Sequence, residues 1–490
     1  MEILKIAYRS ILRHKGKMIA IAVLVLFGTF LITFGQSFVD SVSYYSEKAI
    51  RDNFTGDLMI YSERSKDKPS PFSFLSPLQT IQNIDDIENV LYKDPFVDCF
   101  VPYTQNFVTL DFGMEPVDAK KENKAEDDTE DFSMNIIIGM DPIRYRSVFN
   151  NIDVLQGSFF GLADNPEKTK HDDQYTPGIM IEKSVADLYE KKYGKPIEIG
   201  QQVTLVAFTQ DGSINATKTN VIGIFNHRAF KRVLQGTSLI DMKTYSQLFN
   251  FVGFETSSLS ETMNQALSAE NEEDIFAASE VDFTEHIKFD ELKEVKLSGY
   301  TMIAIKLKKG ITLEEGLEHF QKLGPQYKFK VVKWNEAAGG LDKISYTMKI
   351  FIMITTTLIF IIVGIIIMNT LIINVNERYY EIGTMRAIGA SKNFVRNMFI
   401  TESFIVNLFG FLVGILITVP LNIYFHIKGM AIPKMLSEIL IGGGKLYFVL
   451  TPSPYILGIL IIVIISILAT LYPVSIATKI PPVRAMSEKI

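Results

Sequence analysis

The chain has 490 residues, a formal net charge of −6 and a pI near 5.7. This length is too great for one ordinary domain, and the acidic balance gives no reason to expect a nucleic-acid partner. Hydrophobic residues make up 47% of the chain, and they are concentrated in four stretches without any Asp, Glu, Lys or Arg, at 18–38, 350–373, 403–425 and 453–476. Because about 20 apolar residues cross a bilayer as a helix, these stretches predict four transmembrane helices.

The amino-terminal segment, residues 1–17, is basic and amphipathic. Lys5, Arg9 and Arg13 recur at four-residue spacing, and apolar residues occupy the opposite helical face. This pattern predicts an amphipathic helix on the cytoplasmic membrane surface, although a simple basic flank that sets topology explains the charges equally well. The apolar stretch that follows is longer than a signal-peptide core and has no A-x-A site, so we interpret it as an uncleaved membrane anchor.

Lys and Arg residues near the span ends predict the orientation. They are concentrated in 1–17, in 376–399 and in the tail 477–490, which all lie on one side of a four-span chain. The positive-inside rule places that side in the cytoplasm. Residues 39–349 then form a large extracytoplasmic domain between the first and second spans, and residues 426–452 form a short extracytoplasmic loop.

Strand and helix patterns alternate within the large domain. We expect helices at 182–193 and after Thr312, where Glu315 completes a capping box, and strands at 178–181, 203–208, 219–225, 301–307 and 327–332. These elements predict a mixed α+β domain. Two stretches are expected to be mobile insertions: 118–131, which is highly charged and has no large apolar side chain, and 256–292, which is rich in Ser, Glu and Asp.

The sequence carries no pattern typical of an enzyme. It has no G-x-x-x-x-G-K-[ST], no H-E-x-x-H, no G-x-S-x-G and no cysteine–histidine spacing typical of a metal site. We therefore expect no catalytic residues, no cofactor and no metal. The four apolar stretches also lack the ionisable groups that ion-coupled carriers need, so energy would come from another subunit. Gly410, Gly414 and Thr418 form a small-residue face for close helix packing in the third span.

A polar break separates the second and third apolar stretches. Residues 376–399 read NERYYEIGTMRAIGASKNFVRNMF, with basic residues at Arg378, Arg386, Lys392 and Arg396. The segment is helical in character and is interrupted at Gly389-Ala390-Ser391. We expect a short helix parallel to the membrane between two spans, which would suit a cytoplasmic partner that pushes on it.

The chain resembles the MacB/FtsX class (type VII) of ABC-transporter permeases. NERYYEIGTMRAIGASKNFVRNMFITES is similar to the family's loop after the second span, and IAYRSILRHKGKM, FTGDLMIYSE, IIIGMDPIRY and LYPVSIATKIPPVRAM resemble other family segments. In that family this loop is the coupling helix, which docks on the ATPase subunit. The resemblance implies a docking surface made of Glu377, Arg378, Glu381, Ile382, Gly383, Met385, Arg386, Ala387, Gly389 and Ala390.

The resemblance implies a non-enzymatic permease subunit in the inner membrane of a bacterium, with both termini cytoplasmic and the large domain periplasmic. Its partners would be membrane lipids, a separate ABC ATPase and a second permease chain, identical or different. KVVKWNEAAGGL, which contains Trp334, favours the Lol-type lipoprotein-releasing branch. That branch implies mechanotransmission, in which lipoproteins are extracted from the outer leaflet and passed to a periplasmic carrier.

Three alternatives stay open at the level of the sequence. The chain could signal across the membrane to a cell-wall hydrolase, as FtsX-like proteins do, or export a peptide or antibiotic with a separate ATPase. A membrane-anchored binding protein that couples to no ATPase would leave the 376–399 segment unexplained.

Overall fold

The structure is a computed structural model that describes residues 15–114, 134–149, 152–163, 174–209, 213–254, 294–296 and 299–479, except 72, 74, 75, 77 and 233, together with 7, 9 and 11–13. The expected insertions at 118–131 and 256–292 therefore fall wholly outside the described residues, as do most of the amino-terminal helix and the tail from 480. Two compact units divide the chain: a helical unit, Met1–Ser46 with Lys343–Ile490, and a sheet domain, Glu47–Asp342.

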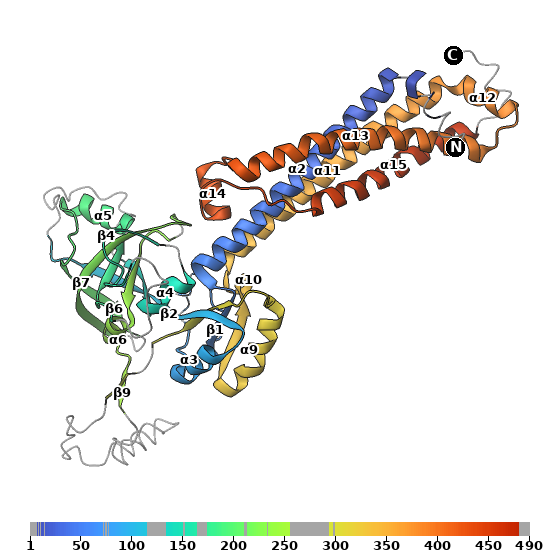
Figure 1. The fold of residues 1–490 in the computed structure, drawn as a ribbon. Coiled ribbons are helices and arrows are strands. Elements are labelled where there is room, and N and C mark those ends of the chain that lie inside the picture. The colour runs from blue at the N-terminus through green and yellow to red at the C-terminus, as the bar shows by residue number, and fades with distance from the viewer. Residues whose placement is uncertain are drawn as a thin grey trace, which may run out of the picture. The chain divides into compact units, whose positions relative to one another are not determined.

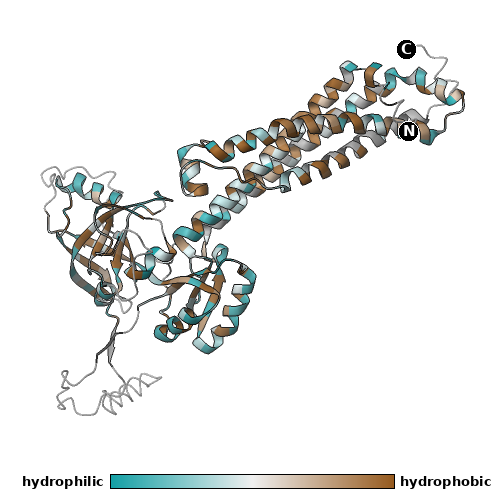
Figure 2. Cartoon of the chain, in the orientation of Figure 1, coloured by the Kyte–Doolittle hydropathy of each residue, from teal (hydrophilic) through white to brown (hydrophobic). Residues whose placement is uncertain are grey.

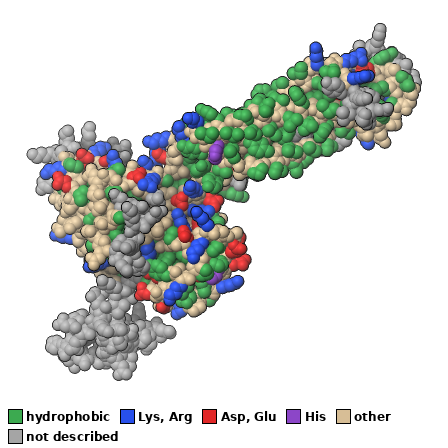
Figure 3. All heavy atoms as spheres, viewed as in Figure 1, with side chains coloured by type: hydrophobic (Ala, Val, Ile, Leu, Met, Phe, Trp, Pro, Cys, Tyr) green, Lys and Arg blue, Asp and Glu red, His purple; other side chains and the backbone are tan. Residues whose placement is uncertain are grey.

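Long helices make up the helical unit, and hydrophobic residues dominate them (Figures 1 and 2). They are α2 (Lys15–Ile50), α11 (Gly340–Glu377), α13 (Lys392–Lys428) and α15 (Ser453–Lys479), with the shorter helices α12 (Tyr379–Ala387) and α14 (Lys434–Ile441). Hydrophobic side chains cover the visible face of this unit, and Lys and Arg gather near its ends (Figure 3).

Two helical segments of the described chain are long and apolar enough to cross a membrane, Met18–Thr55 and Lys392–Lys428. They contain the spans predicted at 18–38 and 403–425. The spans predicted at 350–373 and 453–476 lie within α11 and α15 and stay predictions. The helices also extend beyond the apolar stretches, because the polar residues that follow residue 38 and precede residue 403 continue the same helices without a Gly or Pro break.

The sheet domain contains one large mixed sheet. In the described residues its order is β12-β1-β11-β2-β3-β8-β5-β7-β4, with β6 paired to β2 and β7. The strands are β1 (Leu58–Ser62), β2 (Val97–Asp111), β3 (Met134–Met140), β4 (Ile152–Gly157), β5 (Ile179–Glu182), β6 (Gln202–Phe208), β7 (Ile214–His227), β8 (Thr237–Asp241), β11 (Met302–Leu307) and β12 (Phe329–Lys333). A separate pair joins β9 (Val252–Phe254) to β10 (Glu294–Lys296).

Helices α3 (Ile84–Lys93), α4 (Pro142–Val148), α5 (Lys183–Tyr193), α6 (Met242–Leu248), α9 (Leu313–Tyr327) and α10 (Trp334–Ala337) complete the sheet domain. Ile87 of α3 and Phe320 of α9 pack with Ile60 of β1 in one buried cluster. Tyr189 of α5 and Tyr245 of α6 belong to another. The α+β class predicted for this domain is therefore correct.

Local sequence signals reappear in this domain. Thr312 Oγ1 accepts a hydrogen bond from the Glu315 amide, and the Thr312 amide donates to Glu315 Oε2 at 2.9 Å, so the predicted capping box is present. Strands β6 and β7 form an antiparallel hairpin with Phe208 opposite Ile214, as alternating apolar residues predicted.

The chain passes from α2 into the sheet domain through a π-helix, η1 (Arg51–Thr55). Asp57 joins η1 to strand β11. Its carboxylate accepts a hydrogen bond from Arg51 Nε of η1 and another from the Leu307 amide of β11, both at 2.8 Å. Gly56 has a φ of 66°, and a Cβ there would lie 2.7 Å from the Ile305 carbonyl oxygen. This position therefore requires glycine.

His227 gives the sheet domain an acid sensitivity that can be measured. Burial lowers its pKa to about 3, whereas an unfolded histidine titrates near pH 6.5. Between these values the unfolded chain binds a proton that the folded chain does not, so stability falls as the pH drops below about 6.5. One such proton contributes a slope of up to about 1.4 kcal/mol per pH unit. We expect His227→Gln to flatten the fall in melting temperature between pH 6.5 and 4.5, and an unchanged profile would contradict this assignment.

Candidate functional site

The polar break at 376–399 is mostly helical. It contains the end of α11, the whole of α12 and the start of α13, with Arg378 at the N-cap of α12 and Ser391 at that of α13. Ser391 Oγ accepts from the Phe394 amide at 3.2 Å. Gly389 has a φ of 108°, a conformation that L side chains rarely adopt, and this allows the sharp turn between α12 and α13.

The inner face of α12 is packed within the helical unit. Ile382 belongs to a buried cluster with Val375 of α11 and with Val395, Met398 and Phe399 of α13, and Met385 and Ala390 pack against it. Gly383 is buried as well. The resemblance assigns Ile382 and Gly383 to the docking surface, and both are buried against the rest of the helical unit. Their contact with a docking partner stays a prediction.

Arg378, another residue of the predicted docking surface, is buried in the same place. Its Nη1 lies 2.8 and 3.0 Å from the two carboxylate oxygens of Glu402, and the two side chains are 5% and 2% exposed. The guanidinium also lies over the Phe399 ring, 4.9 Å from its centroid. A buried arginine needs a negatively charged partner, and the Glu402 carboxylate is that partner. Glu402 was not among the residues predicted for this site. The pair joins the start of α12 to α13.

The outer face of α12 has a different character. Tyr380 is 60% exposed, and Ile388, the residue directly after α12, is 83% exposed. Of the predicted docking residues, Glu377, Ala387 and Gly389 are exposed, whereas Glu381, Met385, Arg386 and Ala390 are partly buried. Glu381 Oε1 forms an ion pair with Arg13 Nη1 at 3.1 Å, so the amino-terminal segment lies against α12.

The docking surface implied by the resemblance does not include Tyr380 and Ile388, although the sequence holds a signal for their shared exposure. Residues 380, 384 and 388 follow one another at four-residue spacing, and Thr384 Oγ1 donates to the Tyr380 carbonyl at 2.9 Å. Four-residue spacing places side chains on one face of a helix. Large apolar residues on an exposed face are the feature to look for in a docking surface.

The structure brings Gly410, Gly414 and Thr418 of α13 against α2. A Cβ on Gly410 would lie 2.5 Å from the Ala22 carbonyl oxygen, and one on Gly414 would lie 2.8 Å from Thr29 Cβ. Thr418 Oγ1 lies 3.1 Å from Thr33 Oγ1. Small residues thus allow the two helices to pack closely, and hydroxyl groups bond across the interface.

Two sequence families match this chain. Residues 18–320 match the family described as MacB-like periplasmic core domain, and residues 353–482 match FtsX-like permease C-terminal. The chain belongs to the MacB/FtsX-type family of ABC-transporter permeases. The resemblance seen in the sequence is confirmed, and with it a membrane permease that carries a MacB-like periplasmic domain.

Several relatives are similar over part of their length. The ABC transporter permease YtrF of Bacillus subtilis (strain 168) is 30% identical over 31% of this chain and 35% of that protein. The lipoprotein-releasing system transmembrane protein LolE of Haemophilus influenzae is 30% identical over 25% of this chain and 30% of that protein. The macrolide export ATP-binding/permease protein MacB of Bdellovibrio bacteriovorus is 28% identical over 32% of this chain and 22% of that protein.

The matched segments thus span 22% to 35% of the length of these three curated relatives. The crystal structure of the periplasmic region of MacB from Actinobacillus actinomycetemcomitans covers 61% of this chain and 95% of that chain, with 13% identity and a TM-score of 0.29. That score is too low to bear on the fold.

The buried ion pair can be tested by removing one partner. Glu402→Leu leaves the Arg378 guanidinium buried without a carboxylate, which should cost about 3–5 kcal/mol of unfolding free energy. The matched control is Asp153→Leu, because the Arg228–Asp153 pair, 2.6 Å long, is about half exposed on both sides and should contribute only about 0–1 kcal/mol. Denaturant unfolding of the purified chain in detergent measures both.

The double variant Arg378→Leu/Glu402→Leu buries no charge and should recover much of the stability lost by Glu402→Leu. A double variant less stable than the single one would contradict the ion-pair assignment.

Proposed function

We propose that this chain is the permease subunit of an ABC transporter, and that it transmits movement from a separate ATPase at α12 to the sheet domain. Its cargo is lipoproteins, extracted from the outer leaflet of the inner membrane. In this proposal α2, α11, α13 and α15 all cross the membrane, α12 and both chain ends are cytoplasmic, and the sheet domain is periplasmic. Two permease chains pair in the transporter.

Chain topology supports this arrangement. The apolar stretches 350–373 and 453–476 fall within helices α11 and α15, of 38 and 27 residues, long enough for a bilayer that needs about 20. The Arg13–Glu381 contact places the amino-terminal segment and α12 together, as two segments on the same side of a membrane would be. The amino-terminal segment and the 376–399 segment that contains α12 both carry an excess of Lys and Arg, which the positive-inside rule assigns to the cytoplasm.

The observation that carries the proposal is the contrast between the two faces of α12. The inner face is fixed to α13 by the Arg378–Glu402 pair and the apolar cluster around Ile382. The outer face presents Tyr380 and Ile388. An exposed aromatic and an exposed branched side chain on a firmly attached helix form a compact apolar docking surface, and a push on it would move the base of α13 as well.

Helix continuity gives this movement a route. Gly410 and Gly414 hold α13 closely against α2, and α2 continues without a break past Ser46, where the sheet domain begins. Helix α11 likewise runs from Gly340 to Glu377, directly before Arg378. A continuous helix transmits displacement along its axis because every turn is hydrogen-bonded to the next.

Copurification tests the docking surface. We expect Tyr380→Ala/Ile388→Ser to reduce the amount of ATPase that copurifies with the tagged chain by at least about tenfold, which corresponds to about 1.4 kcal/mol of binding free energy. The matched control is Phe208→Ala/Ile214→Ser, which removes two side chains that are each 65% exposed in the sheet domain. A folded α12 variant that retains the ATPase as well as this control does would refute docking through this face.

The cargo proposal rests on two observations. LolE, named as part of a lipoprotein-releasing system, is a relative, and the apolar surface of the helical unit suits acylated substrates. Depletion of the chain should leave pulse-labelled lipoproteins in the inner membrane of spheroplasts supplied with a periplasmic extract. Replacement with the parent chain should restore release, and the Tyr380→Ala/Ile388→Ser variant should not.

A second candidate function is export of a macrolide-like compound, favoured by the match to the MacB-like periplasmic core domain and by relatives named as macrolide exporters. In the same depletion experiment this function would lower macrolide resistance and leave lipoprotein release unchanged. That outcome would replace the cargo proposal without affecting the docking surface.

A further inference from the structure

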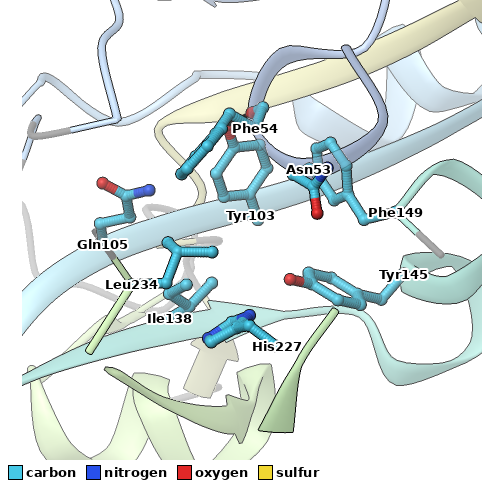
Figure 4. A pocket seen from close by; sticks show the side chains of 9 residues that line it. All are labelled: Asn53, Phe54, Tyr103, Gln105, Ile138, Tyr145, Phe149, His227 and Leu234. Carbon is cyan, nitrogen blue, oxygen red and sulfur yellow. Dashed lines mark hydrogen bonds between the residues drawn. The ribbon is translucent and has the colours of Figure 1, made fainter. Parts of the chain in front are cut away.

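A small buried cavity lies in the sheet domain beside η1, where the chain enters from α2 (Figure 4). It measures about 20 Å³, counted as the space open to the centre of a water molecule. Its lining comes from η1, β2, β3, α4, β7 and the segment before β8, and consists of Asn53, Phe54, Tyr103, Gln105, Ile138, Tyr145, Phe149, His227 and Leu234.

The hydrogen bonds around His227 determine its tautomer. Thr237 Oγ1 donates its one proton to the Leu234 carbonyl at 2.8 Å. The same Oγ1 also lies 2.7 Å from His227 Nε2. Because the Thr237 proton is already used, His227 Nε2 must be the donor in this hydrogen bond. Because burial keeps the ring neutral, the proton on Nε2 leaves Nδ1 as an acceptor.

This acceptor is buried, and it belongs to a side chain that lines the cavity. His227 is 1% exposed, and among the described residues its Nδ1 has no hydrogen-bond partner. A buried polar atom without a partner costs about 1–3 kcal/mol, so a donor at this position would be strongly favoured. In Figure 4 the Tyr145 hydroxyl and the Asn53 amide oxygen point into the same space as the histidine ring.

Size and chemistry together identify the donor. A water molecule needs about 10–15 Å³ of such space and two to four polar partners. The cavity offers about 20 Å³, together with an imidazole nitrogen, a hydroxyl and an amide oxygen. Most of its other lining side chains are apolar, and no carboxylate is among them, so the site lacks the charged oxygens that a divalent cation requires.

We infer that the cavity is a binding site for one internal water, which donates to His227 Nδ1 and links η1, through Asn53, to α4 and β7. The other side of η1 is held directly. The Phe54 carbonyl accepts from the Tyr103 hydroxyl at 2.8 Å, and the Phe54 ring lies 5.2 Å from the Phe230 ring. The π-helix is thus attached to the sheet by dry contacts at Phe54 and by a water at Asn53.

A structure of the full chain in lipid nanodiscs, at a resolution that shows waters, tests this site directly. The expected result is one density peak within about 3.2 Å of His227 Nδ1 that also lies within hydrogen-bonding distance of Tyr145 or Asn53. A cavity without density overturns the inference. A peak with several oxygen ligands at about 2.3–2.6 Å would mark a cation and would also overturn it.

Thermal unfolding provides a second, independent test. A shared water makes Asn53→Leu and His227→Leu non-additive, so the double variant should lose much less melting temperature than the sum of the two single losses. The control pair is Asn53→Leu with Ile138→Val. Ile138 lines the same cavity but has no polar group to lose, so the two losses of melting temperature should be additive. Additive losses in both pairs would refute a bridging water. If His227→Leu does not fold, His227→Gln replaces it in the same cycle.

Discussion

The buried Arg378–Glu402 ion pair is the interaction on which the candidate site depends. A guanidinium removed from water is tolerated only where a carboxylate and further contacts replace its hydration, and Glu402 and the Phe399 ring do so here. Because Arg378 is the N-cap of α12 and Glu402 lies on α13, this requirement sets how α12 is placed on α13. The exposure of Tyr380 and Ile388 on the outer face follows from that placement.

The contact between α13 and α2 depends on a different kind of force. Lipid tails are as apolar as leucine, so helices inside a membrane gain little from hydrophobic burial against each other. Close van der Waals packing and interhelical hydrogen bonds act in its place. Glycines at 410 and 414 permit the approach, and the Thr418–Thr33 and Asn422–Ser37 contacts, at 3.1 and 2.9 Å, bond across it. A larger residue at either glycine would separate the helices and break both hydrogen bonds.

Local patterns were sufficient to predict the strands around Val203 and Thr219, the capping box at Thr312 and the small-residue face on α13. The sheet order was not predictable, since β3 pairs in parallel with β8 across about 100 residues and alternation carries no information about such partners. The inward direction of Arg378 was missed for a similar reason. A basic residue in a membrane loop normally faces water, and its burial depends on a glutamate 24 residues away in sequence. Tyr380 and Ile388 were missed because the family motif, rather than the helical face, guided the choice of residues.

The two ends of the proposed transmission route differ in their physical chemistry. At α12 the main contact is the buried Arg378–Glu402 ion pair, so a displacement there would separate opposite charges in a medium of low dielectric constant. At η1 one side of the attachment goes through a water, whose hydrogen bonds can change partners at little cost. Under the proposed function, a displacement of α12 would therefore be transmitted along the helices almost undiminished. It would be absorbed at η1, because the attachment of η1 to the sheet is more compliant than that of α12 to α13.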